Sequence, residues 1–426
     1  MNHPTPSRAY ARYTLGLLAI MNIFNFVDRQ AITILFEPIK ADLGLSDGQL
    51  GFMAGAAFAV FYAVLGIPFG RLADVWSRRK LIALGLAAWS AMTVLSGVAR
   101  NFGQLLGARI GVGVGEAAFG PAALAIISDL FPPARRSLAQ AVYASGVPIG
   151  AGLGVLVGGF VAQKYDWRIA FFLLGGPGLL LAVLAWFLRE PQRGGAEGTL
   201  VEDVMRPGAA GRMKEILFRT PTLRYHCVGV SFIVFAIAGF SIWMPSFLQR
   251  YHDLSLAQAG GLAGLVFATA GLLGVMMGGW LADLFARRRV DGRMRLILMG
   301  ALAAAPFTVA TLFIERLGAF VACFWLTSMI SSMWFAPGTS TVHDVVEPRH
   351  RGIAIAVYFF FINILGFALG PFIVGLLSDL AGELRTAMLI CPAMGILGAL
   401  TLQLGARHIG ADRDRALAHA ASREIV

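Results

Sequence analysis

Four ionisable side chains stand inside long apolar stretches of this 426-residue chain: Asp28, Arg29, Arg109 and Glu116. In a bilayer an ionised side chain costs at least about 2.5 to 3.5 kcal/mol on insertion scales, so each needs a reason to be there. Arg109 and Glu116 are seven residues apart, which on an α-helix leaves them about 20° short of two full turns and therefore on one face. Asp28 and Arg29 diverge by about 100°, so we expect them to pair with other helices.

The chemistry that these residues offer is proton binding and recognition of an anion. Burial and a nearby arginine act on the proton affinity of a carboxyl in opposite directions, so a conformational change that moves the arginine binds or releases a proton. We therefore predict proton coupling through Asp28 or Glu116, against the alternative of a static ion-pair network. Guanidinium groups suit an anionic head group. Arg29 is the favoured substrate residue and Arg109 the favoured member of the charge network.

The elements that must position these side chains are membrane-spanning helices. Hydrophobic residues make up 57% of the chain and charged residues only 14%, whereas a soluble protein carries about a quarter charged residues, so a soluble enzyme and a disordered chain are excluded. A spanning helix needs about 20 apolar residues. Twelve spans are expected, at residues 13–36, 49–73, 81–98, 104–127, 137–162, 169–188, 223–249, 257–282, 296–314, 317–342, 352–378 and 386–406.

The basic residues indicate the topology. The loops on the side of both termini hold 26 Lys plus Arg and 14 Asp plus Glu, if Arg71 and Arg224 at the adjoining span ends are included. The loops on the other side hold 7 Lys plus Arg and 8 Asp plus Glu. By the positive-inside rule both termini are expected in the cytoplasm, in a multi-pass protein of the inner or plasma membrane. The net charge of +11 is then a topology signal, and no nucleic-acid partner is expected. The first span is too long and too charged for a cleaved signal peptide.

An internal repeat divides the chain into two halves. Ser46 matches Ser255 at an offset of 209, which also carries Arg78 and Arg79 onto Arg287 and Arg288. Asp129 matches Asp344 at an offset of 215, so six extra residues are expected in the second half near Val290 to Arg295. Six spans per half relate the halves by an axis along the membrane normal. We expect an all-α integral membrane fold of twelve helices in two parallel six-helix repeats. The expected parts are bundles at 1–188 and 223–406, a cytoplasmic linker at 189–222 and a cytoplasmic tail at 407–426.

The stretch from Gly70 to Lys80, between the second and third spans, resembles the signature loop of the major facilitator superfamily and recurs in part after the eighth span. Asn25 to Arg29 in the first span and Gly113 to Ala117 in the fourth are similar to the spinster branch of that family. The resemblance implies a transporter that works by alternating access. For the spinster branch it implies proton-linked movement of lysophospholipids or sphingosine phosphate.

Charged residues of the signature loop and its repeat are predicted to form a cytoplasmic gate: Asp74, Arg78, Arg79, Asp283, Arg287 and Arg288. An aspartate there can pair with an arginine or with a helix N-terminus; the alternative is a plain topology signal. In the fifth span Gly150, Gly154 and Gly158 allow close helix packing. Val155 stands there where an antiporter motif usually has proline.

The repeat also bears on the substrate. The second-half counterparts of the four charged residues are uncharged: Ile237, Ala238, Phe324 and Ser331. If the resemblance holds, one wall of a central cavity is charged and the other apolar, which suits an anionic amphiphile. The predicted apolar wall consists of Phe235, Trp243, Phe324 and Trp334, although each could instead face lipid or pack between helices. The alternative substrate is a small organic anion such as a sugar acid.

The sequence lacks the motifs that other classes of membrane protein need for their chemistry. The chain has no His-Glu-x-x-His and no Gly-Lys-Ser/Thr motif, which disfavours a metalloprotease and an ATP-driven pump. The twofold repeat without a filter-like segment disfavours a channel. Cys227, Cys323 and Cys391 have no paired spacing. We expect no enzyme activity, catalytic residue, metal or cofactor other than the coupling proton. The expected partners are the lipid bilayer and the amphiphile, bound by a monomer.

Overall fold

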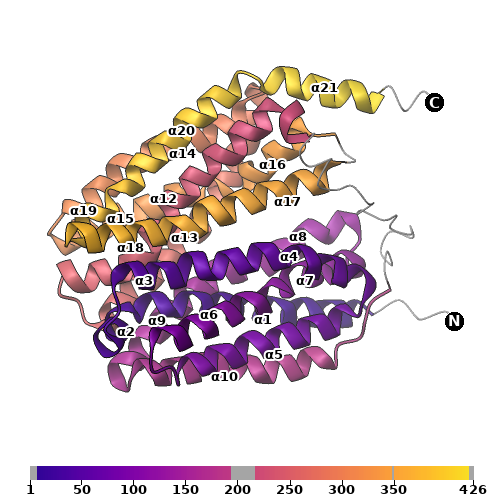
Figure 1. Cartoon of the computed structure of the whole chain (residues 1–426). Coiled ribbons are helices and arrows are strands. Elements are labelled where there is room, and N and C mark those ends of the chain that lie inside the picture. Colours follow the sequence, from indigo (N-terminus) through magenta and orange to yellow (C-terminus); the bar gives the residue numbers. More distant parts are fainter. Residues whose placement is uncertain (1–6, 193–215, 348–349, 422–426) are drawn as a thin grey trace. The chain divides into compact units, whose positions relative to one another are not determined.

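The computed structural model describes residues 7–192, 216–347 and 350–421, and in these ranges every regular element is a helix (Figure 1). The first half contains α1 (Arg8–Ile34), α2 (Phe36–Leu43), α3 (Asp47–Phe52), α4 (Phe58–Val75), α5 (Arg78–Ser96), α6 (Phe102–Ala117), α7 (Phe119–Leu130), α8 (Pro133–Ala144), α9 (Gly146–Lys164) and α10 (Trp167–Trp186). The second half contains α12 (Pro221–Tyr251), α13 (Leu256–Arg288), α14 (Gly292–Phe313), α15 (Leu317–Ser332), α16 (Phe335–Val345), α17 (Arg351–Phe361), α18 (Leu369–Ala381), α19 (Leu384–Met388), α20 (Ile390–Ala406) and α21 (Ile409–Ala421). The all-α expectation is confirmed.

Eleven helices of the described part are long and apolar enough to cross a membrane. The expected third span is not among them, although α5 occupies its place. The reason is that the first turn of α5 carries Arg78, Arg79 and Lys80, which shorten its apolar portion. We call the side of the membrane from which α1 starts the N-terminal side and the opposite side the far side.

Several spans are interrupted rather than continuous. A π-helical turn, Met53–Ala57, joins α3 to α4, and a second one, Ile362–Ala368, joins α17 to α18. The fourth span breaks at Ala118 between α6 and α7. Such interruptions free backbone groups inside the membrane and often mark functional sites.

The repeated Leu-Ser-x-x-Gln motif serves the same local purpose in both halves. Ser46 and Gln49 form a reciprocal capping box at the start of α3. Ser255 and Gln258 exchange the same two bonds before α13, with nitrogen-to-oxygen distances of 3.0 and 3.4 Å. The motif therefore starts the second span of each half by satisfying backbone N–H groups that the helix leaves free.

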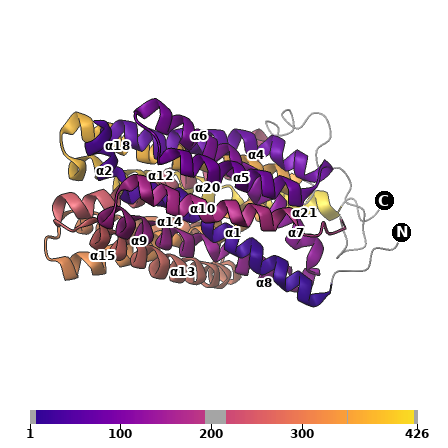
Figure 2. The same ribbon diagram turned by 90° about the horizontal axis from the view of Figure 1, so that it is seen from below.

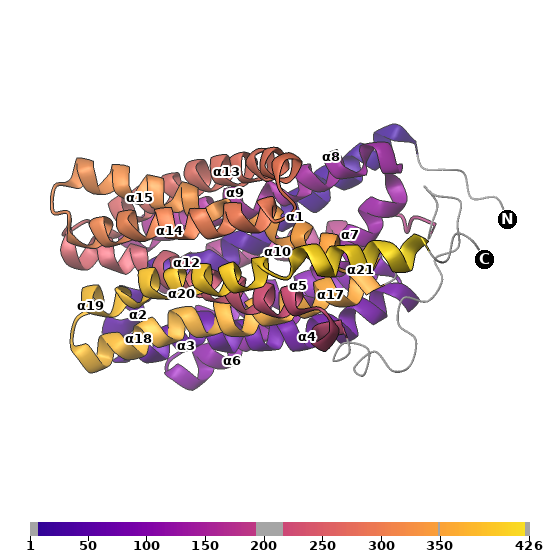
Figure 3. The same cartoon turned by 90° about the horizontal axis from the view of Figure 1, so that it is seen from above.

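The helices form two compact units. Unit 1 comprises residues 1–202 and 244–268, and unit 2 comprises 203–243 and 269–426. In unit 1 α1 packs on α9 and α5 on α10 (Figure 2). In unit 2 α14 packs between α15 and α20, and α21 follows α20 along the chain (Figure 3). Most of the linker expected at 189–222 lies outside the described residues.

The last turns of α12 and the first turns of α13 belong to unit 1. Glycines explain this packing. A Cβ at Gly159 of α9 would lie 2.5 Å from the carbonyl oxygen of Leu256 in α13, and one at Gly154 would lie 2.6 Å from that of Val27 in α1. Because only hydrogen fits at these crossings, α9 holds both helices backbone to backbone.

Candidate functional site

The four charged residues of the sequence analysis meet in unit 1, between α1 and α6. Arg29 bonds Glu116 through two nitrogens, with Nη2 at 2.6 Å and Nε at 3.2 Å from the same carboxylate oxygen. The side chain of Glu116 is fully buried, while that of Arg29 is 26% exposed. Arg29 is therefore the member of this pair that a molecule outside the helix packing can reach.

Aromatic rings surround the guanidinium of Arg29. Its Cζ lies 4.3 Å from the ring centroid of Phe58, 4.8 Å from that of Phe26 and 5.0 Å from that of Tyr62. Cation–π contacts of this kind hold an arginine without adding a second negative charge. Among the described residues, the side chain thus has three aromatic neighbours and one carboxylate partner, Glu116.

Arg109 acts on Asp28 through the backbone. Its Nη2 donates to the main-chain carbonyl oxygen of Asp28 at 3.1 Å, and its Cζ lies 5.7 Å from the ring of Phe171. The other terminal nitrogen, Nη1, is buried without a hydrogen-bond partner among the described residues. Arg109 therefore has an unused N–H donor near the carboxyl group of Asp28, to which it does not donate.

The Asp28 carboxyl group is the unusual member of the site. Asp28 is only 1% exposed, and neither carboxyl oxygen has a hydrogen-bond partner in the described part of the chain. The side chains of Trp89 and Thr93 of α5 lie near enough to act on it as weak hydrogen-bond donors, although neither forms a hydrogen bond of normal geometry. A buried ionised carboxylate without donors is costly, and a bound proton removes that cost.

Local interruptions of the helices place these groups. The π-helical turn Met53–Ala57 ends directly before Phe58, whose ring stacks on Arg29. The break at Ala118 follows Glu116 by two residues. A Cβ at Gly115 would lie 2.6 Å from the backbone nitrogen of Trp89, so a glycine is required for α5 to approach α6 closely enough to place Trp89 near Asp28.

Sequence reasoning missed the uncharged neighbours of the site. Asn25 lies beside Glu116, one turn before Arg29 on α1. Trp89 and Thr93 are four residues apart on α5 and hence share a face. Asn25 stood in the motif from Asn25 to Arg29, so its spacing of four from Arg29 was the available signal. Nothing in the sequence distinguished Trp89 from other aromatic residues of the spans.

A second charged network lies at the N-terminal side of unit 1. Arg78, predicted as a gate residue, is buried and forms salt bridges with Asp129 and with Glu190, the latter at 3.1 Å. Arg79 donates to the carbonyl oxygen of Leu188 at 2.8 Å. Asp74 is exposed. The first-half arginines thus tie α5 to the end of α7 and to the segment after α10.

Glu190 caps the start of α5. Its carboxylate accepts from the hydroxyl of Ser77 at 2.7 Å and from the backbone nitrogens of Arg78 and Arg79 at 3.0 and 3.1 Å. Burial raises the pKa of Glu190, but these hydrogen bonds outweigh burial and leave the pKa below its ordinary value. The sequence analysis gave this residue no role.

The second half repeats the network in a different register from the one we expected. Arg293 bonds Asp344 in a bidentate fashion at 2.6 and 2.7 Å and lies 3.6 Å from Asp283. With the offset of 215, Arg293 is the counterpart of Arg78, as Asp344 is of Asp129. Arg287 and Arg288, which we had matched to Arg78 and Arg79, are exposed and form no ion pair with the described residues.

A third cluster, which the sequence analysis did not predict, lies at the far side of unit 1. Arg250 at the end of α12 bonds Asp47 through both terminal nitrogens, at 2.6 and 2.7 Å, and Glu37 at 2.8 Å. Lys40 also bonds Asp47, at 2.7 Å. Asp47 is buried. The cluster connects the first helix of the second half to α2 and α3 of the first half.

The four aromatic residues of the predicted apolar wall belong to unit 2 and are buried. The indole N–H of Trp243 donates to the carbonyl oxygen of Pro371 at 2.9 Å, and Phe324 packs edge-on against Phe240 at 5.9 Å between centroids. Trp334 lies in the hydrophobic core of the unit. In this conformation Trp243 and Phe324 offer no surface to a ligand, and the wall role stays a prediction.

Comparisons with known proteins agree with this architecture. The family model described as Major Facilitator Superfamily matches residues 18–290 and 261–424. An MFS-type efflux pump of Mycolicibacterium smegmatis is 33% identical over 404 residues, which cover 93% of this chain and 92% of the pump. Protein spinster homolog 1 of Mus musculus is 28% identical over 445 residues, covering 97% of this chain and 84% of the mouse protein.

Solved structures of transporters are also similar to this chain. The chain is similar to a bacterial homolog of the human lysosomal transporter spinster, solved in an inward-facing and unoccupied conformation. The TM-score is 0.86 at 26% sequence identity, and the alignment covers 96% of this chain and 99% of that one. The nucleoside transporter NupG, at 12% identity and a TM-score of 0.74, shares the fold.

Proposed function

The chain belongs to the major facilitator superfamily and is a spinster-like transporter; on that premise we propose that it moves an anionic amphiphile across the membrane by proton-coupled alternating access. Both termini lie in the cytoplasm, as the positive-inside rule requires for the side richer in Lys and Arg. The coupling residue is Asp28, with Glu116 as the second titratable member of the site.

The observation that carries the proton step is the isolation of the Asp28 carboxyl group. It is buried and forms no hydrogen bond of normal geometry with the described residues, although Arg109 donates to the backbone carbonyl of the same residue at 3.1 Å. A proton stabilises the carboxyl group in this arrangement. If α1 or α6 shifts so that the free Nη1 of Arg109 reaches the carboxylate, the ion pair replaces the proton, which leaves.

Substrate binding couples to this step through Arg29. Its guanidinium is held by Glu116 and three aromatic rings, and the side chain as a whole remains 26% exposed. A phosphate or carboxylate head group competes with Glu116 for these donors. Displaced Glu116 then faces Arg109, the second arginine that acts on it. A head group at Arg29 therefore changes the charge around Asp28 without touching it.

The hydrocarbon part of the substrate requires an apolar surface. The second-half positions that correspond to the charged cluster carry Ile237, Ala238, Phe324 and Ser331, so that half supplies no second charge. A polar substrate such as a sugar acid requires hydrogen-bond donors or acceptors on both sides. This asymmetry favours an amphiphile over the small organic anion.

Alternating access requires contacts that open in turn at the two sides. The Arg250 cluster with Asp47 and Glu37 closes the far side of unit 1. The networks of Arg78 and Arg293 at the other side join helices within each half. We assign the Arg250 cluster to the far-side gate and the signature-loop residues, led by Asp74 and Asp283, to the cytoplasmic gate.

The test is transport by purified protein in liposomes. Labelled lysophospholipid and sphingosine phosphate are followed with and without an imposed pH gradient, and glycerol phosphate serves as the head-group-only competitor. Arg168→Gln, which removes an exposed salt bridge to Asp42, is the matched control for Arg29→Gln. Gradient-dependent movement of either lipid, lost in Arg29→Gln and kept in the control, supports the proposal.

Two results count against it. If neither lipid moves but a small organic acid is taken up, the substrate is the alternative anion and the amphiphile is wrong. If a lipid moves at the same rate with and without the gradient, proton coupling is wrong and the carrier is a uniporter.

A further inference from the structure

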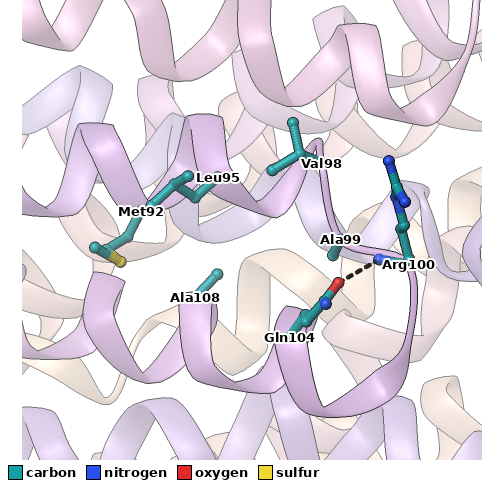
Figure 4. A pocket seen from close by; sticks show the side chains of 7 residues that line it. All are labelled: Met92, Leu95, Val98, Ala99, Arg100, Gln104 and Ala108. Atoms are coloured by element: carbon teal, nitrogen blue, oxygen red, sulfur yellow. Dashed lines mark hydrogen bonds between the residues drawn. The ribbon is translucent and has the colours of Figure 1, made fainter.

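A groove lies between α5 and α6 of unit 1, with a volume of about 400 Å³. Volumes of about 300 to 1,000 Å³ are typical of small-molecule sites. Its apolar end is lined by Met92 and Leu95 of α5 and by Ala108 of α6, and its polar end by Arg100 and Gln104 (Figure 4). The groove thus has the two-part character of an amphiphile.

Glycines of α6 next to the lining residues Gln104 and Ala108 have open surroundings. A Cβ at Gly107 would meet no atom within 4 Å, and one at Gly103 would meet only the side-chain oxygen of Asn101, at 3.5 Å. One turn further on, a Cβ at Gly111 would lie 2.6 Å from Cγ of Met92, so α5 and α6 are in contact there. The helices therefore pack tightly at Gly111 and leave a gap toward the far side.

The groove opens on a face that lipid covers. Leu95 is 47% exposed and Val98 is 54% exposed. In a chain that spans the membrane, large exposed apolar side chains on a helix face hydrocarbon. An acyl chain is therefore the molecule that reaches the groove from its open side.

The polar end carries an available cation. The backbone nitrogen of Arg100 donates to Oε1 of Gln104 at 2.8 Å, which fixes the loop between α5 and α6. The neighbouring Arg168 is paired with Asp42 at 2.7 Å. The guanidinium of Arg100 is exposed and has no carboxylate partner among the described residues. It follows the far-side end of α5, where phospholipid head groups lie, and guanidinium suits phosphate.

We propose that this groove binds a phospholipid of the surrounding bilayer. One acyl chain lies along Met92, Leu95 and Ala108, and the phosphate bonds the guanidinium of Arg100. The site is separate from the charge cluster of Asp28, and its occupant is a resident lipid of the far-side leaflet rather than the transported molecule. The inference stands independently of the proposed substrate.

Native mass spectrometry of the full-length protein in a mild detergent tests it, with phosphatidylglycerol as the probe. Arg100→Gln removes the phosphate contact, and Gly107→Leu places a side chain next to the lining residue Ala108, where no atom stands in the way. Arg316→Gln and Gly318→Leu are the matched controls, since Arg316 is the exposed arginine directly before α15 and Gly318 is the repeat counterpart of Gly103 with equally open surroundings.

We expect one lipid to be retained by the wild type and by both controls. Arg100→Gln should lower the apparent affinity about tenfold, which corresponds to a lost charge-assisted hydrogen bond, and Gly107→Leu should abolish retention. Undiminished retention in both variants overturns the site. Equal competition by glycerol phosphate assigns the site to a free phosphate instead, and preferential binding of the transported lysolipid assigns it to substrate; either result overturns the resident-lipid inference.

Discussion

The salt bridge between Arg29 and Glu116 should dominate the stability of the charge cluster, and its two ends should differ in cost. Removing one partner of a buried ion pair costs about 3 to 5 kcal/mol because the other charge is left uncompensated. Arg29→Gln leaves Glu116, whose side chain is fully buried, so we expect a loss of about 3 kcal/mol in the free energy of unfolding.

Glu116→Gln leaves a different residue behind. Arg29 remains 26% exposed and stacked on Phe58 at 4.3 Å. Water and the aromatic ring then compensate part of its charge, so the expected cost is only about 1 to 2 kcal/mol. The double variant should cost less than the sum of the single variants by about 1 to 3 kcal/mol.

Equilibrium unfolding in mixed detergent micelles, followed by circular dichroism across an SDS titration, measures these free energies. The pair of Arg168 and Asp42 is the control, since its distance of 2.7 Å is similar but its side chains are 29% and 43% exposed. An exposed pair should couple by at most about 1 kcal/mol. Strict additivity of the Arg29 and Glu116 variants, or a greater loss in Glu116→Gln than in Arg29→Gln, would refute the reasoning.

Three further predictions concern the charged clusters at the two ends of the helices. Arg250→Ala should leave Asp47 buried without its arginine and should therefore raise the rate of amide hydrogen exchange in residues 36–43. An unchanged exchange rate would count against a far-side gate. Glu190→Gln should lower the Tm at pH 7. Because the folded pKa of Glu190 is lowered, its stabilisation is complete above the unfolded pKa of about 4.3 and disappears as the pH falls through the folded pKa. Thermal melts of wild type and variant should therefore converge at pH values below the folded pKa, and a constant difference would contradict the capping role. Arg293→Gln should lower the Tm by several degrees in thermal melts, whereas Arg287→Gln should change stability by at most about 0.5 kcal/mol. Equal effects of the two variants would contradict the correspondence of Arg293 with Arg78.

The charged cluster shows how far sequence reasoning reaches. The cost of charge in the membrane identified all four of its members, and helical spacing placed Arg109 and Glu116 on one face of α6. The pairing of Arg29 with Glu116 was open, because two cations and two anions allow several arrangements. The backbone contact of Arg109 with Asp28 depends on how closely α1 approaches α6, which no spacing rule supplies.

The repeat illustrates the opposite limit. The repeat predicted a charged network in each half, and matching residues by type made Arg287 the counterpart of Arg78. In the structure the residue that pairs as Arg78 does is Arg293. The six extra residues of the second half, which we expected near Val290 to Arg295, lie before Arg293, and α13 extends to Arg288. The Arg250 cluster escaped notice for a similar reason, because its members come from segments about 200 residues apart whose proximity depends on the glycine contacts of α9.

The central claim is that Asp28 carries the coupling proton. Its direct test is the proton movement that accompanies substrate transport, read from a pH-sensitive dye inside liposomes when lysophospholipid is added without an imposed gradient. Wild-type protein should change the internal pH in proportion to the lipid moved, and Asp28→Asn, reconstituted at equal amount and with unchanged circular dichroism, should change it not at all. A full proton signal from Asp28→Asn would contradict the assignment.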